Sequence, residues 1–293
     1  MGDAPADGSS GTADRPRRRL PAFVPALLLV LAGLGATACG STSEAGAAGT
    51  VAGPTTTAAP AAPSADDPLS VVVAGDSVMD NLAEALVPAL DFGGTAVVSH
   101  TWLLGLTRDT ASRLELERTV VTADPDVVVV LMGVWELDPL EGLLGTPGWE
   151  QRYDREVLDP FVDLATAHGA QVLWLGMPAT ADPQVTADLG ELDRVYADLD
   201  RRDPRVSFLD LGTLLDGPDG GYAELLPVTG GPPQRVRQTD GLHLCPAGTV
   251  LAVSAVLDRL VEHWGVAVAD GWEAGTWRAT QGVEAGEDRC PGD

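Results

Sequence analysis

Residues 69–79 constrain the fold of this chain more than any other stretch. They open with a short apolar, β-branched run that ends in a glycine, which is typical of a buried strand. Apolar residues then recur at steps of four and predict one face of a helix: Val78, Leu82, Leu86 and Leu90. Ser77 therefore stands where a strand ends and a helix begins. In an open α/β sheet, ligands bind at this edge.

The tripeptide Gly75-Asp76-Ser77 has two interpretations. A serine at this point has an exposed hydroxyl and a backbone N–H at a helix N-terminus, where an anion is favoured. That suits a nucleophile that must generate and hold an oxyanion. The alternative is a turn followed by a helix cap, because Asp and Ser are both good N-cap residues. The tripeptide alone does not separate the two.

Apolar runs alternate with helical patterns along the rest of the domain. Strands are predicted at 70–74, 95–99, 127–132, 171–176 and 206–211. Helices are predicted at 78–90, 108–123, 151–168, 188–202 and 246–263. This alternation predicts a flavodoxin-like three-layer α/β/α sandwich with a central, mostly parallel five-stranded sheet. The stretch 212–239 lacks periodicity and is interpreted as a lid-like loop. We favour Arg235 and Arg237 as solvated charges, the alternative being that they meet a carboxylate of the substrate.

The N-terminal residues 1–38 have the layout of a signal peptide or membrane anchor. A basic cluster at 15–19 precedes an uncharged stretch at 20–38, and Ala36 and Ala38 stand directly before Cys39. Cys39 after small residues is similar to the lipobox of bacterial lipoproteins, in which the cysteine is acylated. We favour lipidation at Cys39 over a retained anchor, and both over simple cleavage with free secretion. All three predict an extracytoplasmic location in a bacterial cell envelope.

The next segment, 39–67, is rich in Ala, Thr and Pro and predicts a disordered tether. A domain follows at 68–265, and a C-terminal tail at 266–293 is expected to pack on it. Cys245 and Cys290 are the cysteines left if Cys39 carries lipid. In an oxidising compartment they predict a disulfide, the alternative being two free thiols.

The formal net charge is −25, and every basic residue other than histidine is arginine. Such an acidic chain repels nucleic acid and anionic lipid headgroups, and it accommodates neutral or cationic substrates more easily. We therefore expect no nucleic-acid partner, and membrane contact only through the N-terminal anchor or lipid.

Asp240-Gly-Leu-His243 precedes the last helix and carries a second chemical signal. Residues three apart on a glycine-permitted turn can point the same way, so the Asp240 carboxylate can accept from the imidazole Nδ1–H. The other ring nitrogen is then free to take the proton of Ser77. His100 follows a strand and is a weaker candidate, while His168 and His263 lie near helix ends, where they suit the helix dipole.

Two loops after strands complete the candidate site. Gly105 permits close approach of a backbone N–H to a ligand, or simply a turn. Gly133-Val-Trp135-Glu136 can contribute to an oxyanion hole. The alternative is that Trp135 is a core or lid aromatic and Glu136 a charge at the start of a helix.

The order and spacing of these blocks resemble the SGNH (GDSL) hydrolase superfamily. The resemblance implies Ser77 as nucleophile, His243 as base and Asp240 as its orienting carboxylate. It also implies an oxyanion hole from the N–H groups of Ser77 and Gly105. The family's third donor is an asparagine, and this chain has Trp135 there, in a Gly-x-Trp-Glu block similar to SGNH-like domains that accompany envelope acyltransferases. Losing one oxyanion donor costs about 10²–10³ in rate unless the indole N–H replaces it.

These observations predict an extracytoplasmic serine esterase or O-acyltransferase that acts on small acyl esters of envelope glycans. No metal or organic cofactor is implied, and we expect a monomer that binds an acylated carbohydrate or another small ester. The alternative is a catalytically weak module of the same fold that binds glycan through aromatic faces, with Trp102, Trp135 and Trp149 as candidates.

Overall fold

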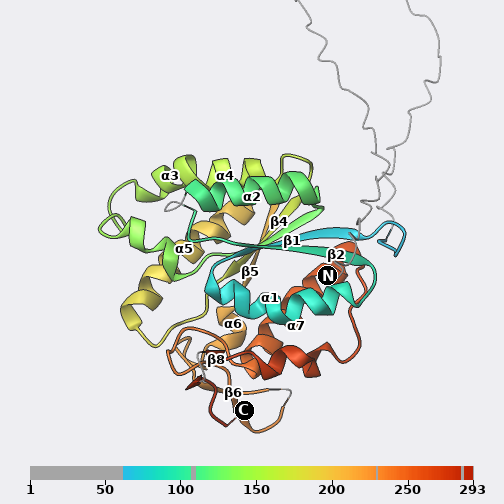
Figure 1. Ribbon diagram of the computed structural model, residues 1–293. Helices are drawn as coiled ribbons and strands as arrows, with labels where there is room; N and C mark the ends of the chain where they lie inside the picture. Colours follow the sequence, from blue (N-terminus) through green and yellow to red (C-terminus); the bar gives the residue numbers. More distant parts are fainter. Residues whose placement is uncertain (1–61, 107–109, 229, 285–286, 293) are drawn as a thin grey trace, which may run out of the picture. The chain divides into compact units, whose positions relative to one another are not determined.

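A computed structural model describes residues 62–106, 110–228, 230–284 and 287–292 of the protein. They surround a five-stranded sheet in the order β2-β1-β3-β4-β5, with every neighbouring pair parallel (Figure 1). Its strands are β1 (Leu69–Gly75), β2 (Ala96–Trp102), β3 (Val127–Leu131), β4 (Gln171–Gly176) and β5 (Val206–Asp210). This is the flavodoxin-like strand order, so the predicted fold class is confirmed.

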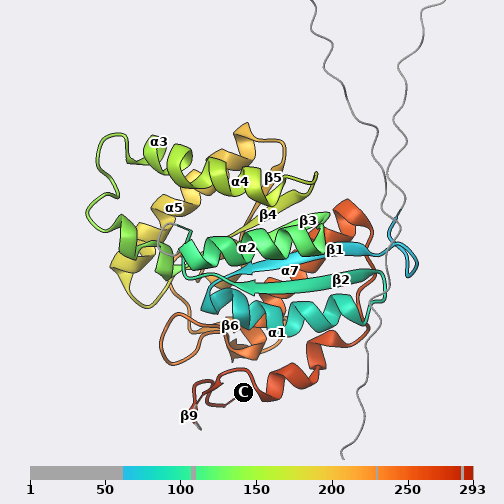
Figure 2. The same cartoon turned by 45° about the horizontal axis from the view of Figure 1, so that its top comes forward.

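Helices cover both faces of the sheet, as Figures 1 and 2 show from two directions. One face carries α1 (Ser77–Asp91) and α7 (Pro246–Trp264). The other carries α2 (Thr110–Ala123), α3 (Trp149–Tyr153), α4 (Asp159–Ala165) and α5 (Pro183–Arg202). Successive side chains of a strand point to opposite faces, so Val71 and Val73 enter one core and Val72 and Ala74 the other. Burial on both faces explains why these strands show no polar alternation.

Helix α5 begins five residues before the predicted start. The Asp182 carboxylate accepts from the N–H groups of Gln184 and Val185, at 2.8 and 3.3 Å, and Pro183 follows the cap. An aspartate before a proline is a standard helix start. In this first turn only Val185 packs against the core, so the turn adds little to the apolar periodicity.

The helix predicted at 151–168 is real but not uniform. It comprises α3, a π-helical turn at Asp154–Leu158 and α4, so it begins and ends earlier than predicted. The π turn ends two residues before Pro160, and the Asp159 N–H donates to the Asp154 carbonyl. Proline has no N–H to continue the regular ladder, and a wider turn accommodates that loss.

The stretch 212–239, predicted to lack structure, contains short regular elements. They are α6 (Gly212–Leu215) and the antiparallel strands β6 (Leu225–Pro227) and β7 (Pro233–Arg235). Elements of three or four residues are too short to leave a periodic signal in the sequence. Smaller elements complete the description: the 3₁₀ turns Val134–Glu136, Asp138–Leu140, Trp272–Ala274 and Thr276–Ala279, and the strands β8 (Val283–Glu284) and β9 (Glu287–Asp288).

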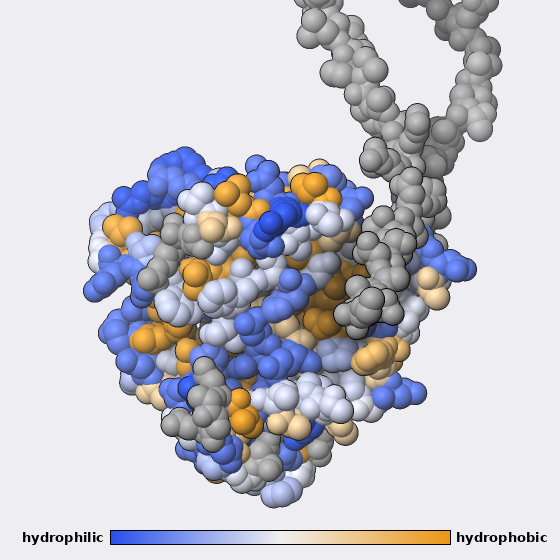
Figure 3. Space-filling model, in the orientation of Figure 1, coloured by the Kyte–Doolittle hydropathy of each residue, from blue (hydrophilic) through white to orange (hydrophobic). Residues whose placement is uncertain are grey.

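The C-terminal tail lies against α1 and the start of β2. Ala267 N–H donates to the Thr95 hydroxyl at 2.7 Å, Ala269 N–H donates to the Ala89 carbonyl at 2.8 Å, and Trp277 is buried in the core. On the face drawn in Figure 3, hydrophilic residues are interspersed with smaller hydrophobic areas.

No helix in the described ranges combines the length and apolar character needed to cross a membrane. The predicted signal segment 1–38, Cys39 and the tether up to residue 61 lie outside the described residues.

Candidate active site

Ser77 is the first residue of α1, directly after the end of β1 and beside the point where the strand order reverses. The strand must end in glycine here. A Cβ at Gly75 would lie 2.2 Å from the Leu131 carbonyl oxygen and 2.5 Å from the Met79 Cβ. Only a residue without a side chain lets β1 lie this close to β3 while the chain turns into α1 and presents the serine hydroxyl at the sheet edge.

Asp76 is the N-cap of α1, so the capping interpretation of Gly-Asp-Ser is correct for this residue. Its carboxylate is fully buried and accepts from the N–H of Val78 at 3.0 Å and from the N–H of Gly133 at 2.9 Å. Burial raises the pKa of Asp76 to about 6, against the effect of these two hydrogen bonds. The cap thus fastens the nucleophile turn to the loop after β3.

The structure brings Ser77, His243 and Asp240 into one line of contacts. His243 Nε2 lies 2.8 Å from the Ser77 Oγ, and His243 Nδ1 lies 2.8 Å from Asp240 Oδ2. Only this histidine among the four contacts Ser77 within the described ranges: His100 Nε2 lies 2.9 Å from Asp80, and His168 Nδ1 lies 3.0 Å from Asp124.

The turn around Gly241 holds the Asp240 carboxylate. Asp240 Oδ1 accepts from the backbone N–H groups of Leu242, at 2.9 Å, and His243, at 3.0 Å. Gly241 has φ +73°, and a Cβ there would lie 2.3 Å from the Ala181 Cβ. Burial alone would raise the pKa of Asp240, but the hydrogen bonds from Leu242 and His243 outweigh it and hold the pKa below its usual value. The carboxylate is therefore kept ionised beside the imidazole.

Two residues that sequence reasoning missed tie the His243 turn to the rest of the site. Asn81 Oδ1 accepts from the Leu244 N–H at 3.1 Å, and the Gln238 side chain donates to the Leu244 carbonyl at 3.0 Å. Gln238 N–H also donates to the His243 carbonyl at 2.8 Å. Asn81 follows Ser77 by four residues and so shares its helix face, which is a signal that the sequence did contain.

Gly105 and the Trp135-Glu136 turn lie side by side. Gly105 has φ +100°, and a Cβ there would lie 3.0 Å from a Glu136 carboxylate oxygen and 3.1 Å from the Trp135 carbonyl oxygen. The N–H groups of Ser77 and Gly105 have no acceptor among the described residues. This arrangement leaves two backbone donors available, while the role of Trp135 as a third donor stays a prediction.

Glu136 lies in the 3₁₀ turn Val134–Glu136, as the helix-start interpretation expects, but it is a buried residue rather than a solvated charge. Its side chain is fully buried and accepts from the Leu106 N–H at 2.5 Å and from the Tyr153 hydroxyl at 2.9 Å. The Tyr153 hydroxyl lies 3.2 Å from that of Tyr196, and burial raises the pKa of both tyrosines. Glu136 therefore fastens the loop that carries Gly105 to the loop after β3.

A cavity of about 340 Å³ opens beside the nucleophile. Its lining residues come from α1, the His243 region and the C-terminal tail: Ser77, Asp80, Asn81, Glu84, Gln238, His243, Thr280, Gly282, Val283 and Arg289. Burial, followed by the charge of Asp80, raises the pKa of Glu84. Gly105 and Trp135 are not among the described residues that line it. Of the other candidate aromatics, Trp149 is buried and Trp102 is 46% exposed at the end of β2.

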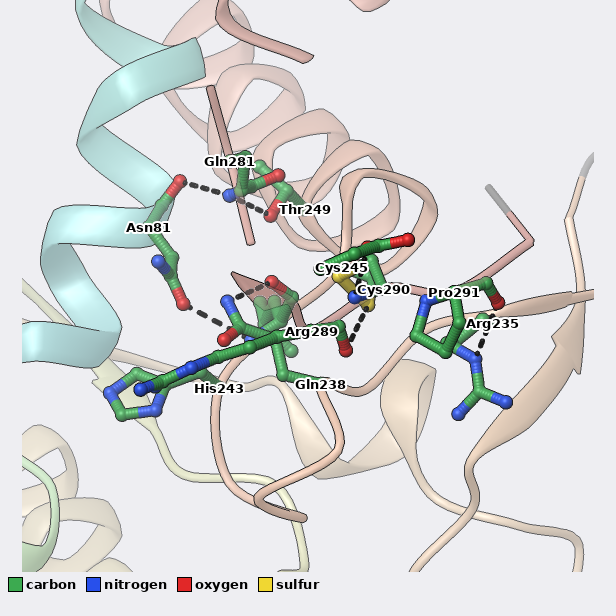
Figure 4. The surroundings of a disulfide bond; sticks show 12 residues. Asn81, Arg235, Gln238, His243, Cys245, Thr249, Gln281, Arg289, Cys290 and Pro291 are labelled. Carbon is green, nitrogen blue, oxygen red and sulfur yellow. Dashed lines mark hydrogen bonds between the residues drawn. A yellow bond between two sulfur atoms is a disulfide. The ribbon is translucent and has the colours of Figure 1, made fainter. Parts of the chain in front are cut away.

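The predicted disulfide between Cys245 and Cys290 is present, two residues from His243 (Figure 4). It fixes the tail beside the site, where Arg289 Nη1 lies 3.6 Å from Asp240 Oδ2.

The two arginines of the preceding loop differ from expectation. Arg237 is fully buried and donates to the carbonyls of Ala179 and Leu215, so it is not a solvated charge. Arg235 pairs with Glu224 and donates to the Pro291 carbonyl.

Several solved structures resemble the chain at low identity. An acetyl xylan esterase, AlAXEase, shares 16% identity with a TM-score of 0.46, over 65% of this chain and 99% of the other. LAE5, described as an alpha/beta hydrolase enzyme from the metagenome of Lake Arreo, Spain, shares 17% identity with a TM-score of 0.45, over 64% and 93%. A catalytic mutant of Axe2, an acetylxylan esterase from Geobacillus stearothermophilus, shares 16% identity with a TM-score of 0.43, over 65% and 93%.

No curated protein matches the sequence of this chain. Residues 70–259 match the family described as "Protein of unknown function (DUF459)". The matched range includes Ser77, Gly105, Asp240 and His243 and stops before the tail. The chain therefore belongs to DUF459, an SGNH-hydrolase-like family.

Proposed function

We propose that this protein is a serine esterase or O-acyltransferase that cleaves small acyl esters through Ser77, His243 and Asp240. The observation that carries the proposal is the unbroken contact line from Ser77 Oγ to His243 Nε2 and from His243 Nδ1 to Asp240 Oδ2, at 2.8 Å for each contact. A nucleophile, a base within hydrogen-bond reach and a carboxylate that orients the base are the three parts of an activated serine.

The reaction follows from this geometry. Ser77 Oγ attacks the carbonyl carbon of the ester while His243 Nε2 accepts the hydroxyl proton, and Asp240 accepts the Nδ1–H of the resulting imidazolium. The tetrahedral intermediate collapses when the C–O bond of the alcohol breaks, and His243 returns the proton to the leaving oxygen. The acyl group is then held on Ser77 as an ester.

The second half repeats these steps in reverse. A water molecule or a sugar hydroxyl gives its proton to His243 and attacks the acyl carbon, and the Ser77 oxygen recovers the proton as it leaves. Water gives hydrolysis, whereas a sugar hydroxyl gives acyl transfer. The two outcomes share every residue and differ only in the acceptor that reaches the acyl-enzyme.

The oxyanion of both intermediates would face the start of α1. The Ser77 N–H is at the N-terminus of a 15-residue helix, where the helix dipole favours negative charge. We assign Gly105 N–H as the second donor and the Trp135 indole as the third, in place of the asparagine of related enzymes. The contact of Glu136 with the Leu106 N–H supports the fixed position of this loop.

The substrate class follows from charge. Asp80 and Glu84 line the cavity of a chain with a net charge of −25, which favours a neutral ester over an anionic one. An acylated envelope glycan fits this requirement. The signal-like N-terminus and the Cys245–Cys290 disulfide support an extracytoplasmic location, because disulfides persist in oxidising compartments.

The test is labelling with a fluorophosphonate, which forms a phosphonyl ester with an activated serine and releases fluoride. We expect the full chain to label, and the Ser77→Ala and His243→Ala variants to remain unlabelled although folded. No labelling of folded wild-type protein, together with glycan binding that Ser77→Ala leaves intact, would contradict the enzyme and favour a glycan-binding module.

Product analysis with an acetylated glycan donor and a glycan acceptor separates the two reactions. Free acetate alone identifies an esterase, whereas acetyl groups on the acceptor identify a transferase.

A further inference from the structure

The C-terminal tail forms part of the cavity beside the nucleophile, although it lies beyond the family match that ends at residue 259. Four cavity-lining residues belong to it: Thr280, Gly282, Val283 and Arg289. Ser77, Asp240 and His243 therefore lie inside the matched range, whereas one wall of their cavity is supplied by a segment outside it.

The tail is held at both ends of this wall. The Cys245–Cys290 disulfide fixes one end. Next to it, the Arg289 carbonyl accepts from the Thr239 N–H at 2.9 Å, and the Arg289 N–H donates to the Gly282 carbonyl at 2.8 Å. At the other end, the buried Gln281 side chain donates to the Asn81 carbonyl at 2.9 Å and to the Thr249 hydroxyl at 2.7 Å (Figure 4). Arg289 thus projects from a segment fixed to α1, α7 and the His243 turn.

The Arg289 guanidinium reaches the triad carboxylate. Its Nη1 lies 3.6 Å from Asp240 Oδ2, the same oxygen that lies 2.8 Å from His243 Nδ1. Figure 4 shows the Arg289 side chain extending along the loop toward the His243 ring, while Arg235 points to the opposite side of the disulfide. A cation at this distance attracts the carboxylate and offsets part of its charge, without a hydrogen bond.

The other charged groups around His243 are acidic. Asp240 lies on its own turn, Asp76 lies beside Ser77 at the start of α1, and Asp80 and Glu84 line the cavity from the same helix. Arg289 is the sole arginine among the described residues that line this cavity. Without it, no arginine among the described cavity-lining residues would offset these carboxylates.

We propose that Arg289 is a positioning residue of the proton relay, carried to Asp240 by the Cys245–Cys290 disulfide. This inference rests on the proposed function. Arg289 holds Asp240 in the geometry that directs His243 at Ser77. Its charge also offsets part of the negative charge that Asp240 presents to the imidazole. Loss of the disulfide removes one of the restraints on Arg289 and acts on the relay in the same direction as loss of the guanidinium.

The experiment measures the pH dependence of fluorophosphonate labelling for the full chain and four variants. We expect Arg289→Gln to label about fivefold more slowly at neutral pH, with its acidic limb displaced to higher pH by roughly half a unit, because the imidazolium loses a neighbouring cation. Arg289→Lys restores most of the rate and the profile, since it keeps the charge. Cys290→Ser, or wild-type protein after reduction, follows Arg289→Gln.

Arg235→Gln is the matched control, because Arg235 also contacts the tail through the Pro291 carbonyl but lies away from His243. It should keep the wild-type profile. A wild-type profile in Arg289→Gln, or an equal loss in Arg289→Gln and Arg289→Lys, would overturn the role of the charge while leaving the proposed function intact. Absence of labelling in wild-type protein would overturn the proposed function itself. Arg289→Gln keeps the disulfide, so this test does not depend on how Cys290→Ser folds.

Discussion

The carboxyl edge of the sheet has two acidic regions that differ in how their carboxylates are satisfied. Beyond β1 and β3, Asp240 receives two backbone N–H groups and lies against the His243 side chain, and its pKa is lowered. Beyond β4 and β5, Asp193 lines an open cavity of about 730 Å³ together with Asp210 and Asp216. There, desolvation by burial raises the pKa of Asp193 to about 8, although the Met177 N–H donates to it.

The difference shows which carboxylate can work with an imidazole. A carboxylate stabilises an imidazolium only if it remains ionised while the histidine titrates. Asp240 meets this condition because its donors offset its burial, whereas Asp193 keeps its proton at neutral pH. The second region also contains no serine or histidine within the described lining residues. Partial exposure together with N–H donors, rather than the acidity of the region, therefore distinguishes Asp240 from Asp193, since the fully buried Asp76 also accepts two N–H groups and still has a raised pKa.

The contrast between an ionised Asp240 and a protonated Asp193 is tested most strongly by removing the charge of Asp240. Asp240→Asn retains the size of the side chain but removes the charge and favours the wrong imidazole tautomer, so we expect turnover and labelling to fall by about 10⁴-fold. Asp182→Asn is the control, because asparagine also caps a helix and Asp182 lies away from the site. An Asp240→Asn variant that keeps more than a tenth of the wild-type labelling rate would contradict the assignment.

The proposed oxyanion-hole donors beside Ser77 are tested by a substitution at Gly105. Gly105→Ala places a methyl group 3.0 Å from Glu136 and 3.1 Å from the Trp135 carbonyl at a φ of +100°, so the loop must shift and its N–H moves. Loss of one oxyanion donor predicts a fall in kcat of about 10²–10³.

Gly94→Ala imposes a similar positive φ in open space and should change stability without changing kcat. Equal kcat values for the two variants would remove Gly105 from the oxyanion hole.

Much of this architecture could be predicted from sequence because it depends on local pattern. The buried strands are apolar on both faces, and α1 and α7 show regular apolar spacing, so the three-layer sandwich followed from periodicity. Ser77 and the Asp240–His243 pair were recognisable because each pairs a chemical group with a local turn. The cysteine pairing followed because the expected lipidation of Cys39 left Cys245 and Cys290 as the two remaining cysteines.

The supporting contacts could not be predicted in the same way. Glu136 meets Leu106 across two loops, and Arg289 meets Asp240 only after the tail has folded back along α1. Neither pair is linked by any spacing rule, since the contact depends on the tertiary path of the chain. Arg237 was misjudged for the same reason: no local signal shows that a charged residue will be enclosed by the carbonyls of Ala179 and Leu215.

In the acidic region beyond β4 and β5, the buried Asp193 leads us to expect that the stability of the protein depends on pH. Because the folded pKa of Asp193 is about 8 and the ordinary pKa of an aspartate is 3.8, the folded state keeps a proton that the unfolded chain releases. Stability should therefore fall as pH rises from about 4 to about 8, with a slope of at most about 1.4 kcal/mol per pH unit from this group.

Asp193→Asn should flatten that slope in urea denaturation measured across this range, whereas Asp200→Asn, an exposed aspartate on the same helix, should not. Parallel curves for wild type and Asp193→Asn would show that burial does not govern this carboxylate.

The smallest expected effect concerns Asn81, which joins α1 to the His243 turn. Asn81→Ala leaves the Leu244 N–H without its acceptor, and an unsatisfied buried donor costs about 1–3 kcal/mol, so we expect the labelling rate to fall by roughly tenfold as the imidazole loses its fixed position. Asn81→Asp keeps an oxygen acceptor and should recover most of the rate. If both variants label like the wild type, the turn holds His243 through Asp240 and Gln238 alone, and the donor balance at Asp240 is sufficient to place the base.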